Sequence, residues 1–252
     1  MVPPSGRAER PCERSRHPLV SRDRRPAAAL DALLADLGAS IRRGAPARSE
    51  ETRTRLATGL PEVDRLLCGG LPLGRLSEIH GPPSSGRTSL WLSLVAGVTR
   101  GGECAAVVDH ADAFDPPSAR AAGIDLARVL WARAPGRREA LRCTERLLET
   151  EGFPLVVLDL GAADAGRADQ TAWLRLARLA ARTRTALVLV GTGDRRAGSH
   201  AEVALEMQLE RAHFEGTPAL LEALSSRAVV VRHRSGPAGS AAPVRWRAFA
   251  AA

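Results

Sequence analysis

The chain contains no lysine, no asparagine and no tyrosine, so all 36 side chains counted as Lys or Arg are arginines. This bias indicates compositional pressure on the coding sequence. Long apolar runs are also missing, since no stretch approaches the roughly 18–20 residues that a membrane helix needs. Residues 1–25 lack the apolar region of a signal peptide. We therefore expect a soluble, cytoplasmic protein without membrane contact.

Cysteine and histidine are sparse and scattered. No C-x-x-C pair occurs, and the six histidines show no spacing typical of metal ligands. These absences argue against a disulfide framework and against a zinc site. The four cysteines are Cys12, Cys68, Cys104 and Cys143.

The positive charge is concentrated at the two ends of the chain. Of the net charge of +8, residues 1–25 carry +4 and residues 225–252 carry +5, which leaves −1 for the segment between them. Such ends are typical of tails that make weak contact with nucleic acid or with an acidic partner. Solvated, partly disordered ends are an equally good interpretation.

The 252 residues are enough for one substantial domain with extensions. We predict a disordered basic tail over 1–25, a helix and linker over 26–54, a core domain over 55–235, and a basic strand or tail over 236–252. Leucines at helical spacing from Leu30 to Leu37, with Gly38 after them, predict the N-terminal helix. Removal of residues 1–25 and 236–252 is expected to abolish most nucleic-acid contact and to leave the fold intact.

Short apolar runs alternate with helical stretches inside the core. Strands are predicted at 76–80, 104–109, 129–131, 155–160 and 186–190, and helices at 88–99, 137–149 and 171–182. This alternation predicts an α/β fold with a mostly parallel sheet covered by helices on both faces. Half-exposed strands at 203–209, 228–232 and 244–249 predict an antiparallel edge on that sheet.

A glycine-rich loop follows the first predicted strand of the core. With Arg87 allowed in place of lysine, it matches the G-x-x-x-x-G-K-[ST] phosphate loop, placed between a strand and a helix. Its backbone N–H groups would bind the phosphates of ATP, Thr88 would supply a hydroxyl to Mg²⁺, and Asp159 would supply a carboxylate. The candidate nucleotide-binding residues are Gly81, Ser84, Ser85, Gly86, Arg87, Thr88 and Ser89.

Arg87 weakens this prediction. A guanidinium is larger than an ammonium, and it is planar and forked, whereas the loop is shaped around a compact point charge. We expect weak ATP and Mg²⁺ binding at best, with at most millimolar affinity.

Several signatures together with this loop resemble the core of RecA recombinases, over about residues 26–235. They are TGLPEVD at 58–64, GGLPLGR at 69–75, EIHGPPSSGRT at 78–88, VD at 108–109, FDP at 114–116, AR at 119–120, GID at 123–125 and LD at 158–159. The resemblance implies a RecA-like fold and a role in DNA repair, associated with the nucleoid.

The departures from RecA concern catalysis and DNA binding. The position of the catalytic glutamate is Ala111, whose methyl group cannot activate water, so the resemblance implies a pseudo-ATPase with no catalytic residue. Asp112 lies one residue away and would serve only if the local backbone differs. A nucleotide-sensing glutamine of RecA is replaced near Thr192, and the DNA-binding loops are reduced to about 191–202, with Arg195 and Arg196 as DNA-contact candidates.

A shortened RecA homologue with these losses resembles the ImuA family. Its members are accessory factors of damage-induced (SOS) translesion DNA synthesis, beside the inactive Y-family polymerase-like protein ImuB and an error-prone replicative-type polymerase. The alternative is a weak DNA-dependent ATPase of the RecA/RadA group. A SulA-like cell-division inhibitor is disfavoured, because that family lacks the loop.

Two segments are candidates for partner binding. The resemblance implies that the N-terminal helix, through Leu30, Leu33 and Leu37, contacts RecA; packing of this stripe on its own domain is the other interpretation. The second segment is Arg245-Trp246-Arg247, for the ImuB-like polymerase. An edge-strand residue is the favoured interpretation of Trp246, and the flanking arginines also suit partner contact.

Overall fold

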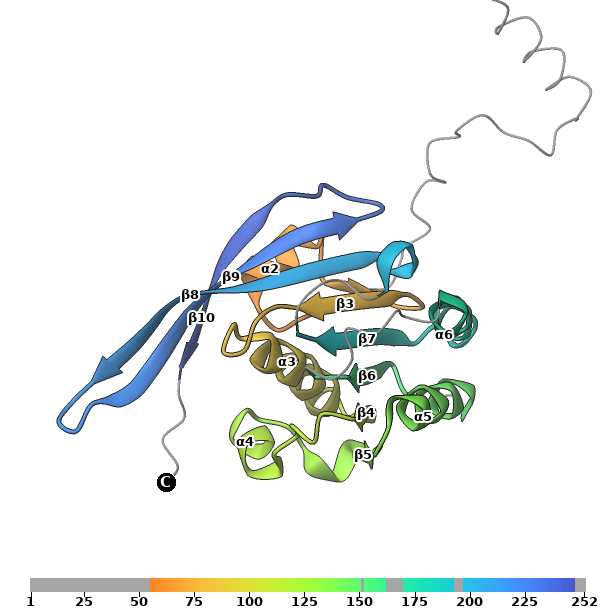
Figure 1. Ribbon diagram of the computed structural model, residues 1–252, viewed down its shortest axis with the longest axis horizontal. Coiled ribbons are helices and arrows are strands. Elements are labelled where there is room, and N and C mark those ends of the chain that lie inside the picture. The colour runs from red at the N-terminus through yellow and green to blue at the C-terminus, as the bar shows by residue number, and fades with distance from the viewer. Residues whose placement is uncertain (1–54, 151, 162–169, 193–196, 248–252) are drawn as a thin grey trace, which may run out of the picture. The chain divides into compact units, whose positions relative to one another are not determined.

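The computed structural model describes residues 55–150, 152–161, 170–192 and 197–247 (Figure 1). The predictions for residues 1–54, which include Leu30, Leu33 and Leu37, lie outside these residues. The same holds for Arg195 and Arg196. No helix in the described part of the chain is long and apolar enough to cross a membrane.

An eight-stranded sheet organises the fold, in the order β10-β9-β8-β3-β7-β6-β4-β5. The six strands from β8 to β5 in this order are parallel, whereas β9 pairs antiparallel with both β8 and β10. The mostly parallel sheet with an antiparallel edge is therefore confirmed. The strands are β3 (Leu76–His80), β4 (Ala105–Asp109), β5 (Val129–Arg133), β6 (Leu155–Asp159), β7 (Ala186–Gly191), β8 (Val203–Glu215), β9 (Leu220–His233) and β10 (Ala241–Arg247). A separate antiparallel pair consists of β1 (Arg55–Leu56) and β2 (Leu71–Pro72).

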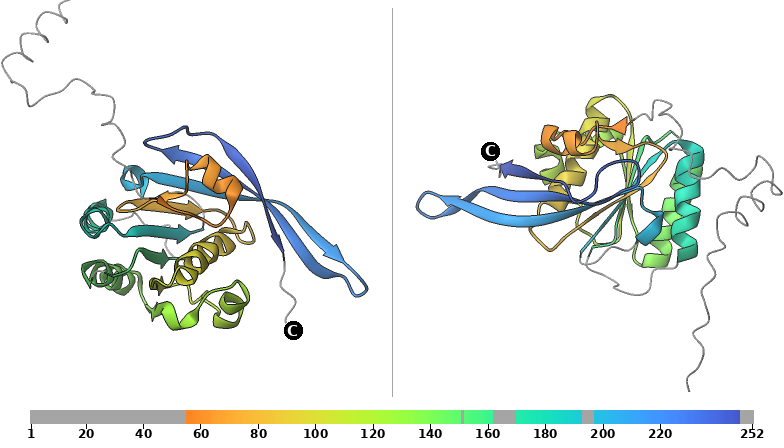
Figure 2. Two further views of the ribbon diagram at one scale, coloured as in Figure 1. Left: turned by 180° about the vertical axis from the view of Figure 1, so that it is seen from behind. Right: turned by 90° about the horizontal axis from the view of Figure 1, so that it is seen from above.

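Helices cover both faces of the sheet, as the views in Figure 2 show. Residues of α2 (Pro61–Leu66), α3 (Arg87–Arg100) and α4 (Pro116–Ala121) contribute to one apolar cluster, and residues of α5 (Arg137–Thr150) and α6 (Gln170–Thr183) to the other. Strands β4, β6 and β7 lie between these clusters and are buried along their whole length. Their nearly continuous apolar sequences reflect this burial on both faces.

Two short helices escaped the sequence analysis. Both α2 and α4 begin with proline. Proline suits the first turn of a helix because the backbone N–H that it lacks would have no intrahelical acceptor there. Asp115 caps α4 by accepting a hydrogen bond from the backbone N–H of Ser118. Six residues are too few for a recognisable apolar period, so only these terminal signals were present.

The antiparallel part of the sheet is longer than its apolar pattern indicated. The strand predicted at 203–209 continues to Glu215, and the strand predicted at 228–232 begins at Leu220. Val203, Ala204 and Leu205 are fully buried rather than half-exposed, because β8 lies between β3 and β9. Since β8 runs parallel to β3 and His80 pairs with Glu206, the rest of this hairpin extends beyond the carboxyl end of β3 (Figure 1).

Residues 241–247 form a strand of the main sheet, so the deletion of residues 236–252 removes part of the fold. All seven residues of β10 pair with β9, from Ala241 opposite Val229 to Arg247 opposite Ala223. Val244 is 5 % exposed and belongs to the core cluster of α3. Removal of residues 236–252 would therefore leave β9 as an unpaired edge strand. The expectation that the fold survives this deletion does not agree with the sheet.

Candidate functional site

The carboxyl edge of the parallel strands brings the predicted site residues together. The phosphate loop follows His80 at the end of β3, while Asp109 and Asp159 end β4 and β6 and pair with each other in the sheet register. In open α/β sheets, ligands bind in the crevice beyond the carboxyl ends of the strands. The predicted loop and acids thus share the edge where such a site belongs.

Two glycines allow the loop its close turns. Gly81 has φ 153°, and a Cβ atom there would lie 2.3 Å from the carbonyl oxygen of Met207 on β8. Gly86 has φ 88° and is the N-cap residue of α3. Because only glycine tolerates such contacts and such a φ angle, the motif spacing is a structural requirement here. The exposed residue Ser84, between the two glycines, also has a left-handed backbone conformation, with φ 61°.

Arg87 folds back onto the loop that it follows. Its Nη1 donates a 2.6 Å hydrogen bond to the carbonyl oxygen of Gly81. Burial lowers the pKa of Arg87 below its ordinary value, while the negative charge of Asp159 acts in the opposite direction. The guanidinium therefore closes the loop internally and lies within the electrostatic influence of the acid predicted to bind Mg²⁺.

The loop nevertheless keeps unsatisfied donors. Among the described residues, the buried hydroxyl of Ser85 and the buried Nε of Arg87 have no hydrogen-bond partner, and no side chain caps the N-terminus of α3. Helix N-termini and donors of this kind suit an anion with several acceptor oxygens, such as a phosphate group. The loop residues therefore fit a phosphate, with Arg87 already engaged in part. Thr88 is half-buried in the first turn of α3, and Ser89 lines the adjacent cavity.

The two strand-end acids have different environments. Asp109 accepts hydrogen bonds from the backbone N–H groups of Ala113 and Phe114 at 3.0 Å each, and from the indole N–H of Trp131 at 3.3 Å. Asp159 accepts a 2.8 Å bond from the N–H of Gly161 and interacts electrostatically with Arg87. Asp109 therefore holds the segment after β4 in place, and Asp159 is the acid associated with the loop.

A carboxylate and a hydroxyl are ligand types that Mg²⁺ accepts together with nucleotide phosphates, so Asp159 and Thr88 have suitable chemistry. A cation bound at Asp159 would have to share the carboxylate with the guanidinium of Arg87. Within the described residues, no group of three or more His, Cys, Asp or Glu side chains is arranged to hold a metal ion.

Ala111 lies where a catalytic acid was expected from the RecA resemblance. A Cβ atom on Gly161, just after β6, would be 2.5 Å from the methyl carbon of Ala111. The backbone at Asp112 does differ from extended chain, with φ 52°. Its exposed carboxylate, however, forms a 2.6 Å ion pair with Arg133 at the end of β5. Thr192 donates its hydroxyl to the carbonyl of Gly161 at 3.2 Å.

Trp246 contacts the phosphate loop, a position that no sequence pattern indicated. A Cβ atom on Gly86 would lie only 2.2 Å from Nε1 of Trp246, so the half-buried indole packs directly on this glycine. Arg245 and Arg247 on either side are exposed. Of the three C-terminal residues predicted to bind a partner, Trp246 thus faces the loop in this conformation.

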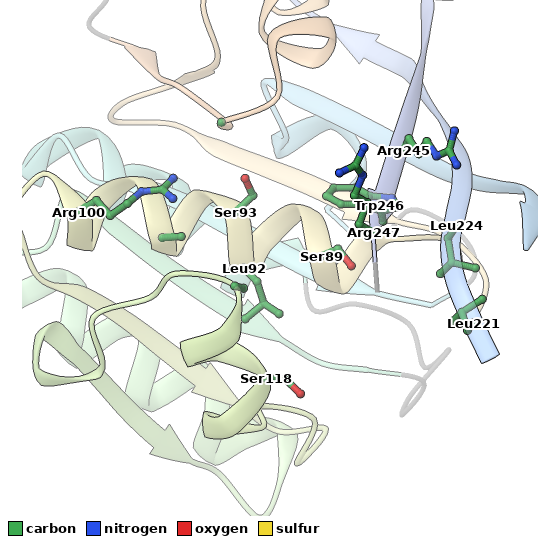
Figure 3. Close-up of a pocket in the computed structure, with 13 residues that line it drawn as sticks. Ser89, Leu92, Ser93, Arg100, Ser118, Leu221, Leu224, Arg245, Trp246 and Arg247 are labelled. Atoms are coloured by element: carbon green, nitrogen blue, oxygen red, sulfur yellow. The ribbon is translucent and has the colours of Figure 1, made fainter. Parts of the chain in front are cut away.

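A cavity of about 510 Å³ adjoins this contact (Figure 3). Its walls come from α3, α4, β9 and β10, including Leu92, Ser118 and Leu224. Three arginines and no acidic residue line it, namely Arg100, Arg245 and Arg247. The cavity therefore favours an anionic occupant.

Comparison with known proteins identifies the family. The RecA N-terminal domain matches residues 36–186. RecA of Synechocystis sp. is 38% identical over 145 residues, which cover 56% of this chain and 41% of that protein. RecA of Crocosphaera subtropica is 39% identical over 133 residues, which cover 52% and 37%. The chain thus spans about two fifths of the length of these relatives.

A solved structure shows the same fold. The crystal structure of the RadB recombinase superposes with a TM-score of 0.60 and 24% identity, over 75% of this chain and 94% of that one. The predicted RecA-like core is therefore confirmed in its architecture. With more than half of its residues matched by the RecA N-terminal domain, this chain belongs to the RecA family.

Proposed function

We propose that the chain is a non-hydrolysing RecA-family accessory protein of damage-induced translesion DNA synthesis. In this role it links RecA to an inactive Y-family polymerase-like protein of the ImuB kind, and through it to an error-prone replicative polymerase. The ImuA-like combination of a RecA core with a damaged nucleotide site supports this role.

The observation that carries the proposal is the environment of Ala111. Its methyl group lies against the Gly161 position at the edge of the site, and the neighbouring carboxylate of Asp112 is ion-paired with Arg133. Activation of the attacking water in ATP hydrolysis requires a positioned carboxylate or amide. Neither residue supplies one in this arrangement.

A steady-state ATPase assay tests the proposal. We expect no turnover above background, with or without single-stranded DNA, and no difference between the wild type and Asp159→Ala, because activation of water is missing rather than impaired. The control is an authentic RecA under the same conditions. DNA-stimulated hydrolysis that disappears in Asp159→Ala would establish an enzyme and refute the proposal.

A weak DNA-dependent ATPase of the RecA/RadA group is the second candidate. It is favoured by the unsatisfied donors at Ser85 and Arg87 and by Asp159 beside the loop. In that case Asp112 would have to leave Arg133 to reach the site. The same assay decides between the two candidates.

The first partner contact is proposed between RecA and residues 28–38. Replacement of Leu30, Leu33 and Leu37 by Asp is expected to abolish co-purification with RecA, because charged residues cannot occupy an apolar interface. Circular dichroism must accompany the pull-down, because the three aspartates would unfold the domain if the leucines that they replace formed part of its core. A folded triple variant that still binds RecA normally would rule out this contact.

The second contact is proposed between the ImuB-like polymerase and Arg245-Trp246-Arg247. The two arginines are exposed and are well suited to acidic groups of a partner. Trp246 would have to leave Gly86 to serve as an anchor for that partner.

A further inference from the structure

Trp246 connects the edge of the sheet to the phosphate loop. It lies on β10 opposite Leu224 of β9. Three atoms of its indole, Nε1, Cε2 and Cδ1, lie 2.2, 2.9 and 3.0 Å from the position that a Cβ atom would take on Gly86. Figure 3 shows the ring beside the first turn of α3, near Ser89. The indole therefore occupies the space that a side chain at Gly86, the last glycine of the loop, would fill.

This contact covers the N-terminus of α3 without satisfying it. Gly86 is the N-cap residue and no side chain caps the helix, so the positive end of the helix dipole is directed at this region. An indole N–H is a donor only, and Nε1 of Trp246 is buried without a partner. Burial of an unsatisfied donor beside a positive helix end is costly. This cost lowers the free energy needed to break the contact between Trp246 and Gly86.

The neighbouring donors have the same deficit. The hydroxyl of Ser85 and Nε of Arg87 are also buried without partners. These two loop donors beside the helix N-terminus require acceptor oxygens, which a phosphate group supplies and the donor-only indole does not. The indole and a phosphate group therefore suit the same region, and the phosphate suits it better electrostatically.

The strand that carries Trp246 can release it at modest cost. Among the described strands, β10 is the edge of the sheet and pairs only with β9, and Trp246 is the penultimate residue of the strand. Arg245 and Arg247 are exposed. Displacement of residues 245–247 would break only the last pairings and leave Val244 in the core.

We propose that Trp246 and a nucleotide phosphate compete for the same side of Gly86, and that opening makes the indole available to a partner protein. The competition stands on the contacts above, whereas the partner step rests on the proposed function. Because coupling between two binding sites is reciprocal, a partner that captures Trp246 strengthens nucleotide binding, and nucleotide strengthens capture of the partner. The pseudo-active site then acts as a binding switch without hydrolysis.

Calorimetric titration of the full-length chain with ADP and Mg²⁺ tests the competition. Trp246→Ala is expected to bind ADP about tenfold more tightly than the wild type, because the covering ring is gone. Trp246→Phe keeps a ring over Gly86 and is expected to stay near the wild type. Pro243→Ala, an exposed position on the same strand outside the cavity, is the matched control and is expected to bind ADP like the wild type. Circular dichroism establishes that each variant is folded.

The remaining outcomes contradict the proposal. Equal ADP affinity in Trp246→Ala, or no binding by either protein at millimolar ADP, would mean that the ring blocks nothing. Weaker binding in Trp246→Ala would make Nε1 a ligand of the phosphate rather than its competitor. Since ADP requires no hydrolysis, these results are independent of the ATPase assay that tests the proposed function.

A second measurement follows the indole itself. Acrylamide quenching of tryptophan fluorescence, taken as the difference between the wild type and Trp246→Phe, reports the exposure of this residue alone. Saturating ADP is expected to increase that quenching. Unchanged quenching with ADP bound would show that the ring stays on Gly86, and it would overturn the proposal even if Trp246→Ala bound more tightly.

Discussion

Removal of residues 236–252 is expected to unfold the chain or make it aggregate. The deletion takes away all of β10, which pairs with β9 along seven residues and buries Val244 and part of Trp246. Loss of two such side chains from the core costs about 4 kcal/mol, a large share of the roughly 5–15 kcal/mol that stabilises an ordinary domain. It also exposes β9 as a long, unpaired edge. Thermal melting followed by circular dichroism, together with size-exclusion chromatography, measures the effect.

The full-length double variant Arg245→Ser and Arg247→Ser is the control, because it removes the same exposed charges and keeps the strand. We expect it to melt close to the wild type and to show only weaker contact with nucleic acid, with a smaller dependence on salt, as expected for the loss of phosphate contacts. A truncated chain that melts like the full-length protein would contradict the role assigned to β10. It would also restore the interpretation of 236–252 as a tail.

Asp109→Ala is expected to lower the free energy of unfolding by about 3 kcal/mol. Asp109 is 2 % exposed and satisfies the N–H groups of Ala113, Phe114 and Trp131. Its removal leaves three donors without this acceptor, of which the Phe114 N–H is in a buried bond and the other two are in partly buried ones. An unsatisfied donor costs about 1–3 kcal/mol when it is fully buried and less when water can reach it. Urea unfolding followed by circular dichroism gives the value.

The matched control is Asp112→Ala, three residues further along the same turn. Its ion pair with Arg133 is exposed, with about 64% of the Asp112 side chain accessible, and such pairs contribute about 1 kcal/mol or less. A loss in Asp109→Ala no larger than that in Asp112→Ala would show that Asp109 has no structural role. Asp109 would then be a second strand-end acid, beside Asp159, available to the loop.

The proposed nucleotide site and the proposed partner segment meet at the contact of Gly86 with Trp246. Under the proposed function, nucleotide would serve as an allosteric ligand without hydrolysis, since binding alone shifts a two-state contact. Arg245 and Arg247 beside Trp246 give this edge of the sheet a positive character, and Arg100 lines the far end of the adjoining cavity. Charge and the covered loop together favour phosphate-bearing ligands at the same place.

Much of the parallel core was predictable from the sequence. The strands at 76–80, 155–159 and 186–191 and the helices α3, α5 and α6 match their predicted ranges within about two residues. Their apolar runs are continuous because they are buried on both faces, and a glycine-rich turn marks the start of α3. Periodicity and turn chemistry are local properties, so the sequence alone was enough to recognise them.

The phosphate loop and its defect were also determined by the sequence itself. The loop lies after β3, and Arg87 stands in the lysine position, as the spacing of Gly81 and Gly86 indicated. The two glycines have the positive φ angles that the turn requires. The sequence also determined that Ala111 can activate no water, because a methyl group has no proton to exchange wherever it lies.

Only the tertiary structure decided what each polar or aromatic side chain contacts. Asp109 and Asp159 look equivalent as strand-end acids, yet one holds a turn and the other interacts with Arg87. Trp246 follows the loop by 160 residues in the chain and packs on its glycine because β9 folds back and carries β10 with it. Such contacts depend on strand order and register across the whole sheet, which local patterns do not contain.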